Sequence, residues 1–438
     1  MATGTTVQPN LDLHVHYLTR LEGHGNLVVN VREGRVEEAL LHIVEAPRLF
    51  EVMVKGHAYD ELHHMTSRIC GICAVSHTCA SLRATEDALG IELTEQAKLL
   101  RLLAFHGEMA SSHVLHVYFL AAPDLLGVPS VVPLVASHPD VVLRAMRLKK
   151  LFYDLSAIVT GRHTHPIGLA PGGVTYFAKP KELAALKERL VASRADLEAT
   201  VALVKTLALP DFERDTEYVS LTDSARYAYY EGKIKSSEGD VVPVSQYRKV
   251  TNEYVVPHST SKHAKWHRDA YFVGSLARFN NNYAQLHPKA KAVAEALGIK
   301  PKCINPYMNT VAQLVETVHS LEDSIDIINV LLDKGIKPEP LVPPARLDGE
   351  GFGAVEAPRG ILFHNYVYEK GRCVKANCII PTGQNLANID RDLQGLVPKL
   401  LKTDWPDKEK IRQKCEMLIR AYDPCISCSV HLLEMEFK

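Results

Sequence analysis

The sequence lacks the features that would place it in a membrane, on nucleic acid or outside the cell. None of its 438 residues lie in an uncharged apolar run of about 18 or more, so we expect no membrane span. Its 50 Lys and Arg nearly balance its 51 Asp and Glu, which leaves no charge excess to attract nucleic acid. No basic segment leads into an apolar one near residue 1, so we expect no secretion signal and a cytoplasmic location.

Motifs that define other architectures are also missing. There is no Gly-x-Gly-x-x-Gly fingerprint, so any nicotinamide or flavin chemistry would belong to partner chains. No repeat, low-complexity tract or hinge-like linker divides the chain, which favours a single domain over residues 1–438. We expect a mainly α (α+β) fold, in which a central bundle of long helices carries small antiparallel β excursions.

Residue patterns predict how this domain is arranged along the chain. Alternating apolar residues predict strands at 11–17, 26–31 and 36–43, and a second β region at 361–380. Apolar residues at helical spacing predict these helices: 94–120, 141–160, 181–207, 267–297, 311–334 and 408–422. The expected parts are a β region and first helix in 1–66, a Cys motif and helices in 67–210, irregular strands and loops in 211–271, helices with the second β region and a second Cys motif in 272–431, and a short tail in 432–438.

Two cysteine motifs near opposite ends of the chain are the strongest local signal. Cys70 and Cys73 form a Cys-x-x-Cys with a His at position 77, and Cys425 and Cys428 form another with a His at 431. The nine cysteines of a cytoplasmic protein stay reduced, which favours metal binding or catalysis over structural disulfides. We expect these four thiolates to meet at one metal. On spacing alone, a four-cysteine zinc site, an iron–sulfur or other metal centre, and two unrelated cysteine pairs all remain open.

With five further segments, the two motifs resemble the large, catalytic subunit of NiFe-hydrogenases. The likeness covers nearly the whole chain and is greatest to the cytoplasmic class that includes the sulfhydrogenases and the heterodisulfide-reductase-linked enzymes. The motifs lie at 68–77 and 423–431, and the supporting segments at 20–24, 45–51, 161–166, 356–360 and 380–382. The resemblance implies the reversible heterolytic cleavage of H2 to protons and electrons at a Ni-Fe centre.

The same resemblance implies unequal roles for the four thiolates. Cys70 and Cys425 would be terminal ligands of nickel, while Cys73 and Cys428 would bridge nickel to iron. Iron in this family carries carbon monoxide and cyanide ligands. The residues that resemble their pocket are Arg359, Pro381 and Thr382.

Charged residues around the centre also match the family. His77 would donate a hydrogen bond to Cys73, and Asp423 would pair with Arg359 over the open metal position. Asp124 resembles a further carboxylate beside this open metal position, although it could equally cap a helix.

Heterolytic cleavage releases a proton, so a base must lie near nickel. A terminal thiolate and the guanidine of Arg359 are both candidates, and the sequence does not rank them. Glu22, in an Arg-x-Glu-Gly-His context, resembles the gating glutamate that carries the proton away.

A second metal site and several partner chains also follow from the resemblance. Glu51 and His431, with a backbone carbonyl near Cys378, resemble the ligands of a Mg²⁺ or Fe²⁺ ion. The other five cysteines form no cluster motif, so electrons need an iron–sulfur small subunit. Further subunits of flavin, NAD(P) or heterodisulfide-reductase type would then carry the electrons onward. A maturation protease would remove the tail after His431.

Two alternatives come from other functional classes. One is the metal-free relative in respiratory complex I, which keeps this fold but loses the metal cysteines. The presence of all four thiols counts against it. The other is a zinc-stabilised scaffold without catalysis.

Overall fold

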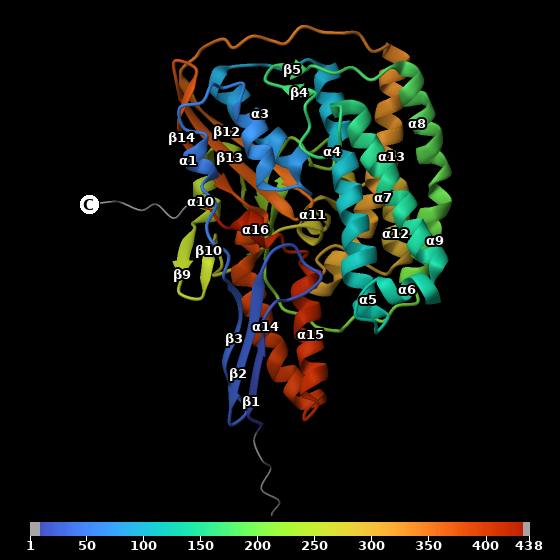
Figure 1. The fold of residues 1–438 in the computed structure, drawn as a ribbon, viewed down its shortest axis with the longest axis vertical. Coiled ribbons are helices and arrows are strands. Elements are labelled where there is room, and N and C mark those ends of the chain that lie inside the picture. Colours follow the sequence, from blue (N-terminus) through green and yellow to red (C-terminus); the bar gives the residue numbers. More distant parts are fainter. Residues whose placement is uncertain (1–8, 432–438) are drawn as a thin grey trace, which may run out of the picture.

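A computed structural model describes residues 9–431 of the chain. Long helices pack side by side on one flank, and β-sheets with their own helices form the other (Figure 1). The flanking bundle is built around α4 (Glu95–Leu115), α7 (Pro139–Thr160) and α13 (Asn309–Lys334). Helices α4 and α13 are buried on several sides, whereas α7 buries one face and leaves Leu143 and Met146 exposed.

The remaining helices surround this bundle or the sheets, and all of them except α14 are shorter than these three. They are α1 (Phe50–Met53), α2 (Leu62–Thr66), α3 (Ala74–Leu89), α5 (Ala122–Leu125), α6 (Val132–Ser137), α8 (Pro180–Ala192), α9 (Arg194–Val204), α10 (Tyr247–Thr251), α11 (Ser275–Asn282), α12 (Pro288–Ala296), α14 (Pro381–Thr403), α15 (Lys408–Ala421) and α16 (Ile426–Ser429). Single turns of 3-10 or π type are η1 (Ser67–Ile69), η2 (His116–Ala121), η3 (Val244–Gln246), η4 (Tyr283–Gln285) and η5 (Pro306–Met308).

Within residues 9–431 the strands form several small sheets. Their orders are β1-β2-β3-β10-β9, β11-β6-β7-β8, β12-β13-β14 and β4-β5. The strands are β1 (Leu11–Val15), β2 (Gly25–Arg32), β3 (Arg35–Ile43), β4 (Leu169–Ala170), β5 (Gly173–Val174), β6 (Glu217–Thr222), β7 (Lys233–Ser236), β8 (Val241–Val242), β9 (Tyr254–Val256), β10 (Ser259–His263), β11 (Tyr271–Phe272), β12 (Gly349–Ala357), β13 (Gly360–Glu369) and β14 (Arg372–Ile379).

Helix α3 lies directly against strand β12. A Cβ atom at Gly353 would come within 2.2 Å of the carbonyl oxygen of Ala80, so only glycine permits this approach. The contact fixes the start of α3, where the first cysteine motif lies, relative to the β12–β13 turn. Arg359 stands in that turn.

The predicted fold class is confirmed, while some element boundaries are wrong. The expected helix 267–297 is divided into β11, α11 and α12, because Gly274 takes a positive φ of 128° and Pro288 starts a new helix. The segment 181–207 forms two helices, and α14 and β12 were not predicted. One hydrophobic cluster contains both Leu11 and Val430, from opposite ends of the described chain.

No helix within residues 9–431 is long and apolar enough to cross a membrane. The predicted tail, residues 432–438, lies outside the described residues.

Candidate metal centre

The first cysteine motif joins a 3-10 turn to a helix. Cys70 follows η1 in extended conformation, and Cys73 occupies the N-cap position of α3. Helix α4 holds this helix start in place, because the carboxylate of Glu108 accepts the backbone N–H groups of Val75 and Ser76 at 2.5 and 2.9 Å.

The second motif follows a strained turn after α15. Asp423 takes a positive φ of 52°, which is uncommon outside glycine, and Pro424 follows it. Cys425 then caps the single-turn helix α16, which carries Cys428. The hydroxyl oxygen of Thr382, at the start of α14, accepts the backbone N–H of Cys425 at 2.9 Å.

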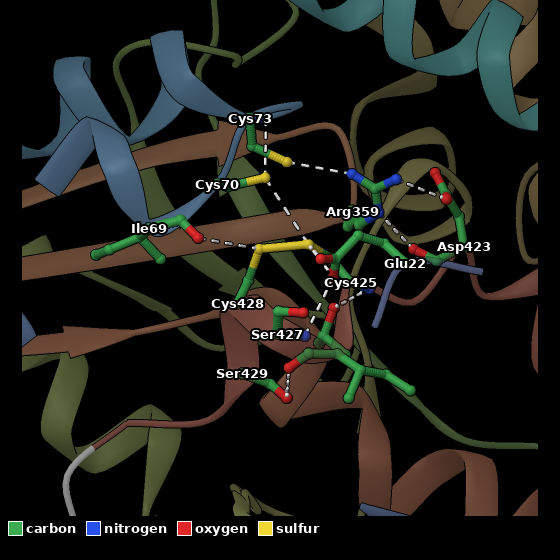
Figure 2. The surroundings of a disulfide bond; sticks show 12 residues. Glu22, Ile69, Cys70, Cys73, Arg359, Asp423, Cys425, Ser427, Cys428 and Ser429 are labelled. Carbon is green, nitrogen blue, oxygen red and sulfur yellow. Dashed lines mark hydrogen bonds and ion pairs between the residues drawn. A yellow bond between two sulfur atoms is a disulfide. The ribbon is translucent and has the colours of Figure 1, made fainter. Parts of the chain in front are cut away.

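The fold brings the two motifs together in the interior, as the sequence predicted. Figure 1 places α16 in the middle of the molecule, and Figure 2 shows the four sulfur atoms side by side. The sulfurs of Cys70 and Cys425 are 3.7 Å apart, and Cys425 and Cys428 are joined by a disulfide. Each cysteine is at most 4% exposed. A hydrogen bond from the Cys73 thiol lowers the pKa of Cys70, which favours a thiolate there.

Arg359 and Asp423 form a buried ion pair beside these sulfurs (Figure 2). The guanidinium donates to the Asp423 carboxylate at 2.8 Å, to the Asp423 carbonyl at 2.6 Å and to the Cys73 sulfur at 3.1 Å. Burial disfavours the charge of Arg359, but Asp423 and the thiols of Cys73 and Cys70 together raise its pKa. Arg359 is therefore a fixed cation aimed at the sulfurs.

Glu22 reaches the second motif from the N-terminal region. Its Oε2 lies 3.1 Å from the Cys425 sulfur, a hydrogen-bond distance for a reduced thiol, and accepts the N–H of Ser427 at 3.1 Å. Gly23 makes this approach possible: it has a φ of 84°, and a Cβ there would lie 2.7 Å from the Ser427 nitrogen. The carbonyl of Glu22 also accepts the N–H of Ile426 at 2.9 Å.

His77 lies near the site but has a different partner from the one predicted. Its Nδ1 is 3.2 Å from Nε2 of His364 on β13, and no hydrogen bond from its ring to Cys73 occurs in the described part of the chain. Burial, together with His364, lowers the pKa of His77 well below its usual value. The expected bond to Cys73 is replaced because β13 presents a buried imidazole directly opposite.

Asp124 contacts neither Arg359 nor a cysteine among residues 9–431. Its carboxylate pairs with Arg20, in the loop that carries Glu22, and with Arg420 of α15 at 2.9 Å. Arg420 in turn donates to the carbonyl of Thr19 at 2.8 Å. Asp124 therefore joins the Glu22 loop to α15. It supports that loop and, contrary to what the resemblance implies, does not lie beside the open metal position.

The proposed second metal site is partly assembled. Glu51 accepts the backbone N–H of Cys378 at 2.6 Å, whereas the resemblance implies a carbonyl near Cys378 that faces the ion. Burial raises the pKa of Glu51 to about 7 and lowers that of His431 to about 3. The backbone of His431 pairs with that of Arg48, just before the helix α1 that carries Glu51, so both candidate ligands lie near this end of the chain.

Arg278, which no sequence motif singles out, supports the turn that carries Arg359. It is fully buried and binds Glu316 and Glu356 at 2.7 and 2.9 Å. It also donates to the carbonyls of Ala357 and Pro358, the two residues before Arg359. A lone Arg within an expected helix gives no sequence signal for this role, because its partners lie far along the chain.

The residues fit a metal centre held by four sulfur ligands. Four buried cysteines converge, a cation neutralises their charge, and a carboxylate reaches one of the sulfurs. Soft thiolates suit nickel, iron and zinc. Binding through all four requires the Cys425–Cys428 disulfide to be reduced.

Comparison with known proteins identifies the family. The sequence matches the nickel-dependent hydrogenases over residues 48–141 and 212–431, and the chain belongs to this family. Within it, the chain is a large, catalytic subunit of a NiFe-hydrogenase, an oxidoreductase that acts on H2. The metal-free relative and the zinc scaffold are not favoured.

Named relatives span nearly the whole chain. The alpha subunit of sulfhydrogenase 2 from Pyrococcus furiosus is 32% identical over 428 residues, covering 95% of this chain and 98% of its own. One subunit of the F420-non-reducing hydrogenase from Methanothermobacter marburgensis is 30% identical over 458 residues, covering 96% of this chain and 95% of its own. Their names show that these relatives are subunits of larger hydrogenases.

Solved structures share the fold. An NAD+-reducing [NiFe]-hydrogenase in the H2-reduced state superposes with a TM-score of 0.87 at 27% identity, covering 96% of this chain and 99% of that one. The [NiFeSe]-hydrogenase of Dm. baculatum, at 22% identity and a TM-score of 0.76, covers 97% of this chain and 100% of that one. The second match supports the fold alone.

Proposed function

We propose that this chain cleaves H2 reversibly and heterolytically at a Ni-Fe centre held by Cys70, Cys73, Cys425 and Cys428. The observation that carries the proposal is the convergence of these four buried sulfurs from opposite ends of the chain, with Arg359 and Glu22 in contact with them. When bound, the two metals supply the Lewis acidity and redox capacity that polarise H2 and accept its electrons.

The four cysteines divide into two kinds of ligand. Cys70 and Cys425 would be terminal ligands of nickel, and Cys73 and Cys428 would be shared between nickel and iron. The short separation of Cys70 and Cys425, 3.7 Å, supports their placement on one metal.

Arg359, Pro381 and Thr382 form the pocket for carbon monoxide and cyanide on iron. Arg359 stands over the sulfurs, and Pro381 opens α14 next to Thr382. Because the Thr382 oxygen accepts the Cys425 N–H, its own O–H would be available to donate to a cyanide ligand.

The Cys425 thiolate takes the proton and passes it to Glu22. Their atoms are already 3.1 Å apart, which is within the range for direct transfer. Arg359 is a poor alternative base, because Asp423 and the thiols hold it in its charged form. Its role is to stabilise negative charge and to orient Asp423.

A second ion, Mg²⁺ or Fe²⁺, binds at Glu51 and His431 with the Cys378 backbone nearby. A carboxylate and a buried neutral imidazole are suitable ligands for such an ion. This ion would fix the end of the described chain next to the second motif.

Electrons are transferred to an iron–sulfur small subunit. They then pass to flavin, NAD(P) or heterodisulfide-reductase-type subunits in the cytoplasm. Segment 161–173 is the proposed docking region: the ring nitrogen of His165 lies 3.0 Å from the Ser67 carbonyl, just before Cys70, and Ile167 is 55% exposed. A maturation protease acting after His431 completes the proposed set of partners.

Isotope exchange between H2 and heavy water tests the reaction and its proton route together. We expect exchange in the purified wild-type complex and, in Glu22→Gln, a rate on the order of 100-fold lower, because the relay carboxylate is lost. Nickel and iron contents and the infrared bands of carbon monoxide and cyanide should be unchanged in the variant.

The matched control is Glu37→Gln, which removes the same charge from an exposed position on β3. It should exchange like the wild type. Unimpaired exchange in Glu22→Gln would place the proton route elsewhere. A wild-type complex without nickel and iron would contradict the function itself.

A further inference from the structure

A second group of potential metal ligands lies away from the cysteine centre and takes no part in the proposed reaction. It consists of His258 in the turn between β9 and β10, His263 at the end of β10, and Asp390 in the middle of α14. One ligand atom from each residue lies within 4.8 Å of the others.

The aspartate is oriented by the edge of β3. Its Oδ1 accepts the backbone N–H of Leu41 at 2.9 Å. The other oxygen, Oδ2, then faces the two imidazoles, at 3.0 Å from Nε2 of His258 and 4.0 Å from Nε2 of His263. The rings of His258 and His263 meet at 76°, so their nitrogens approach the carboxylate from different directions.

His263 is the observation that points to a ligand. Its side chain is 3% exposed, and its Nε2 is buried without a hydrogen-bond partner. A buried polar nitrogen left in this state is unfavourable, and 4.0 Å to Asp390 is too long for a hydrogen bond.

We propose that His258, His263 and Asp390 bind one Zn²⁺ ion that clamps the β9–β10 hairpin to α14. Ligand atoms around a tetrahedral zinc, at bond lengths near 2.0–2.1 Å, lie about 3.3 Å apart. The separations from Asp390 to the two imidazoles, 3.0 and 4.0 Å, bracket this value, and the two imidazole nitrogens lie within 4.8 Å of each other. Side-chain movements would complete the site. Two imidazoles and a carboxylate are a common zinc ligand set, and water takes the fourth position next to His258, which is 17% exposed.

The position of the ion explains what it would do. Strand β10 contacts the second cysteine motif, because the hydroxyl of Ser261 donates to the Ser429 carbonyl at 2.9 Å. Helix α14 contacts the same motif through Thr382. An ion joining β10 to α14 therefore stabilises two elements that hold α16, without touching the Ni-Fe ligands.

Metal analysis of the intact hydrogenase complex tests the proposal. After dialysis against metal-free buffer, the wild-type complex should retain one zinc per copy of this chain more than the variants Asp390→Asn and His258→Gln. Nickel and iron contents, which report on the proposed function separately, should be the same in all. His258→Gln changes a half-buried turn residue, so it also guards against a folding defect in Asp390→Asn.

His267→Gln is the matched control, because both ring nitrogens of His267 already pair with carboxylates, those of Glu217 and Asp240. It should keep the zinc. Equal zinc contents in the wild type and both ligand variants, or no zinc in any of them, would overturn the proposal. Cobalt offered to the zinc-depleted wild type should give visible absorption that His258→Gln lacks.

Discussion

Cys425 lies where three groups meet: its sulfur faces Cys70 and Glu22, and its backbone N–H is held by Thr382. In Cys425→Ser a hydroxyl replaces the soft thiolate, so nickel should lose a terminal ligand. We expect nickel content to fall at least about tenfold, measured by elemental analysis of the purified complex.

Cys303→Ser is the appropriate comparison for that variant. Cys303 is half-buried, and its thiol is not among the predicted ligands. Its nickel content should match the wild type. Normal nickel in Cys425→Ser would show that the terminal ligand is another residue.

For single residues, the sequence predicts that the four cysteines lie close to Arg359, Asp423 and Glu22. They could be found because each occurs in a short motif with an unusual residue order. Asp124 and His77 also occur in recognisable segments, but their partners Arg420 and His364 come from other elements. Side-chain pairing between distant elements leaves no local pattern, so those contacts had to be seen in three dimensions.

The β12–β13 turn is the element on which Arg359 depends. Its carbonyls at Ala357 and Pro358 are held by Arg278, which also neutralises Glu316 and Glu356 in the core. The turn therefore rests on a buried ion network rather than on apolar packing alone, and this network fixes the direction of Arg359.

Arg278→Met should lower the free energy of unfolding by about 3 kcal/mol or more, because it leaves two carboxylates buried without their cation. In the wild type, burial opposes the charge of Glu316, but Arg278 lowers its pKa below the usual range. Without Arg278 the carboxyl pKa values rise. Protonation then removes the buried negative charge at low pH. The loss of unfolding free energy caused by Arg278→Met should therefore be smaller at pH 5 than at pH 8.

Urea unfolding at several pH values measures both effects, with Arg268→Met as the comparison. Arg268 pairs with Asp215 and Glu238 while 38% exposed, so its removal should cost no more than about 1 kcal/mol at any pH. Equal losses for the two variants would mean that the network around Arg278 does not support the turn.

Elements with strong periodicity were predicted well, and those defined by tertiary contacts were not. The hairpin of β2 and β3 and the long helices α4 and α13 agree with expectation. Helix α14 was missed because it begins at Pro381 and carries buried polar residues such as Asn385 and Asp390. These polar groups bind neighbouring elements, so their burial has no apolar signature in the sequence.

At the scale of the molecule, the two ends of the described chain interlock. Residue 22 bridges to residue 425, and residue 48 to residue 431. Gly23→Ala should separate the first pair, because the added Cβ would meet Ser427 and Ile426 within 2.8 Å. We expect the amide of Ile426, which bonds the Glu22 carbonyl, to exchange its hydrogen at least about tenfold faster.

Gly56→Ala separates steric clash from backbone strain in that measurement. Gly56 has nearly the same φ, 85°, but a Cβ there meets nothing within 4 Å. Exchange at Ile426 should stay at the wild-type rate in this variant. If the Ile426 amide exchanged at the wild-type rate in Gly23→Ala, the loop that carries Glu22 would not hold the second cysteine motif in place.

The wide separation of the two cysteine motifs along the chain also delays the completion of the ligand set during synthesis. Cys70 and Cys425 are 355 residues apart, and a ribosome adds about 5–20 residues per second. The first pair of ligands therefore waits about 20–70 seconds for the second to be synthesised. Throughout that interval the two early thiols lack their partner ligands, so the cell must protect them from oxidation and from stray ions until Cys425 and Cys428 are synthesised.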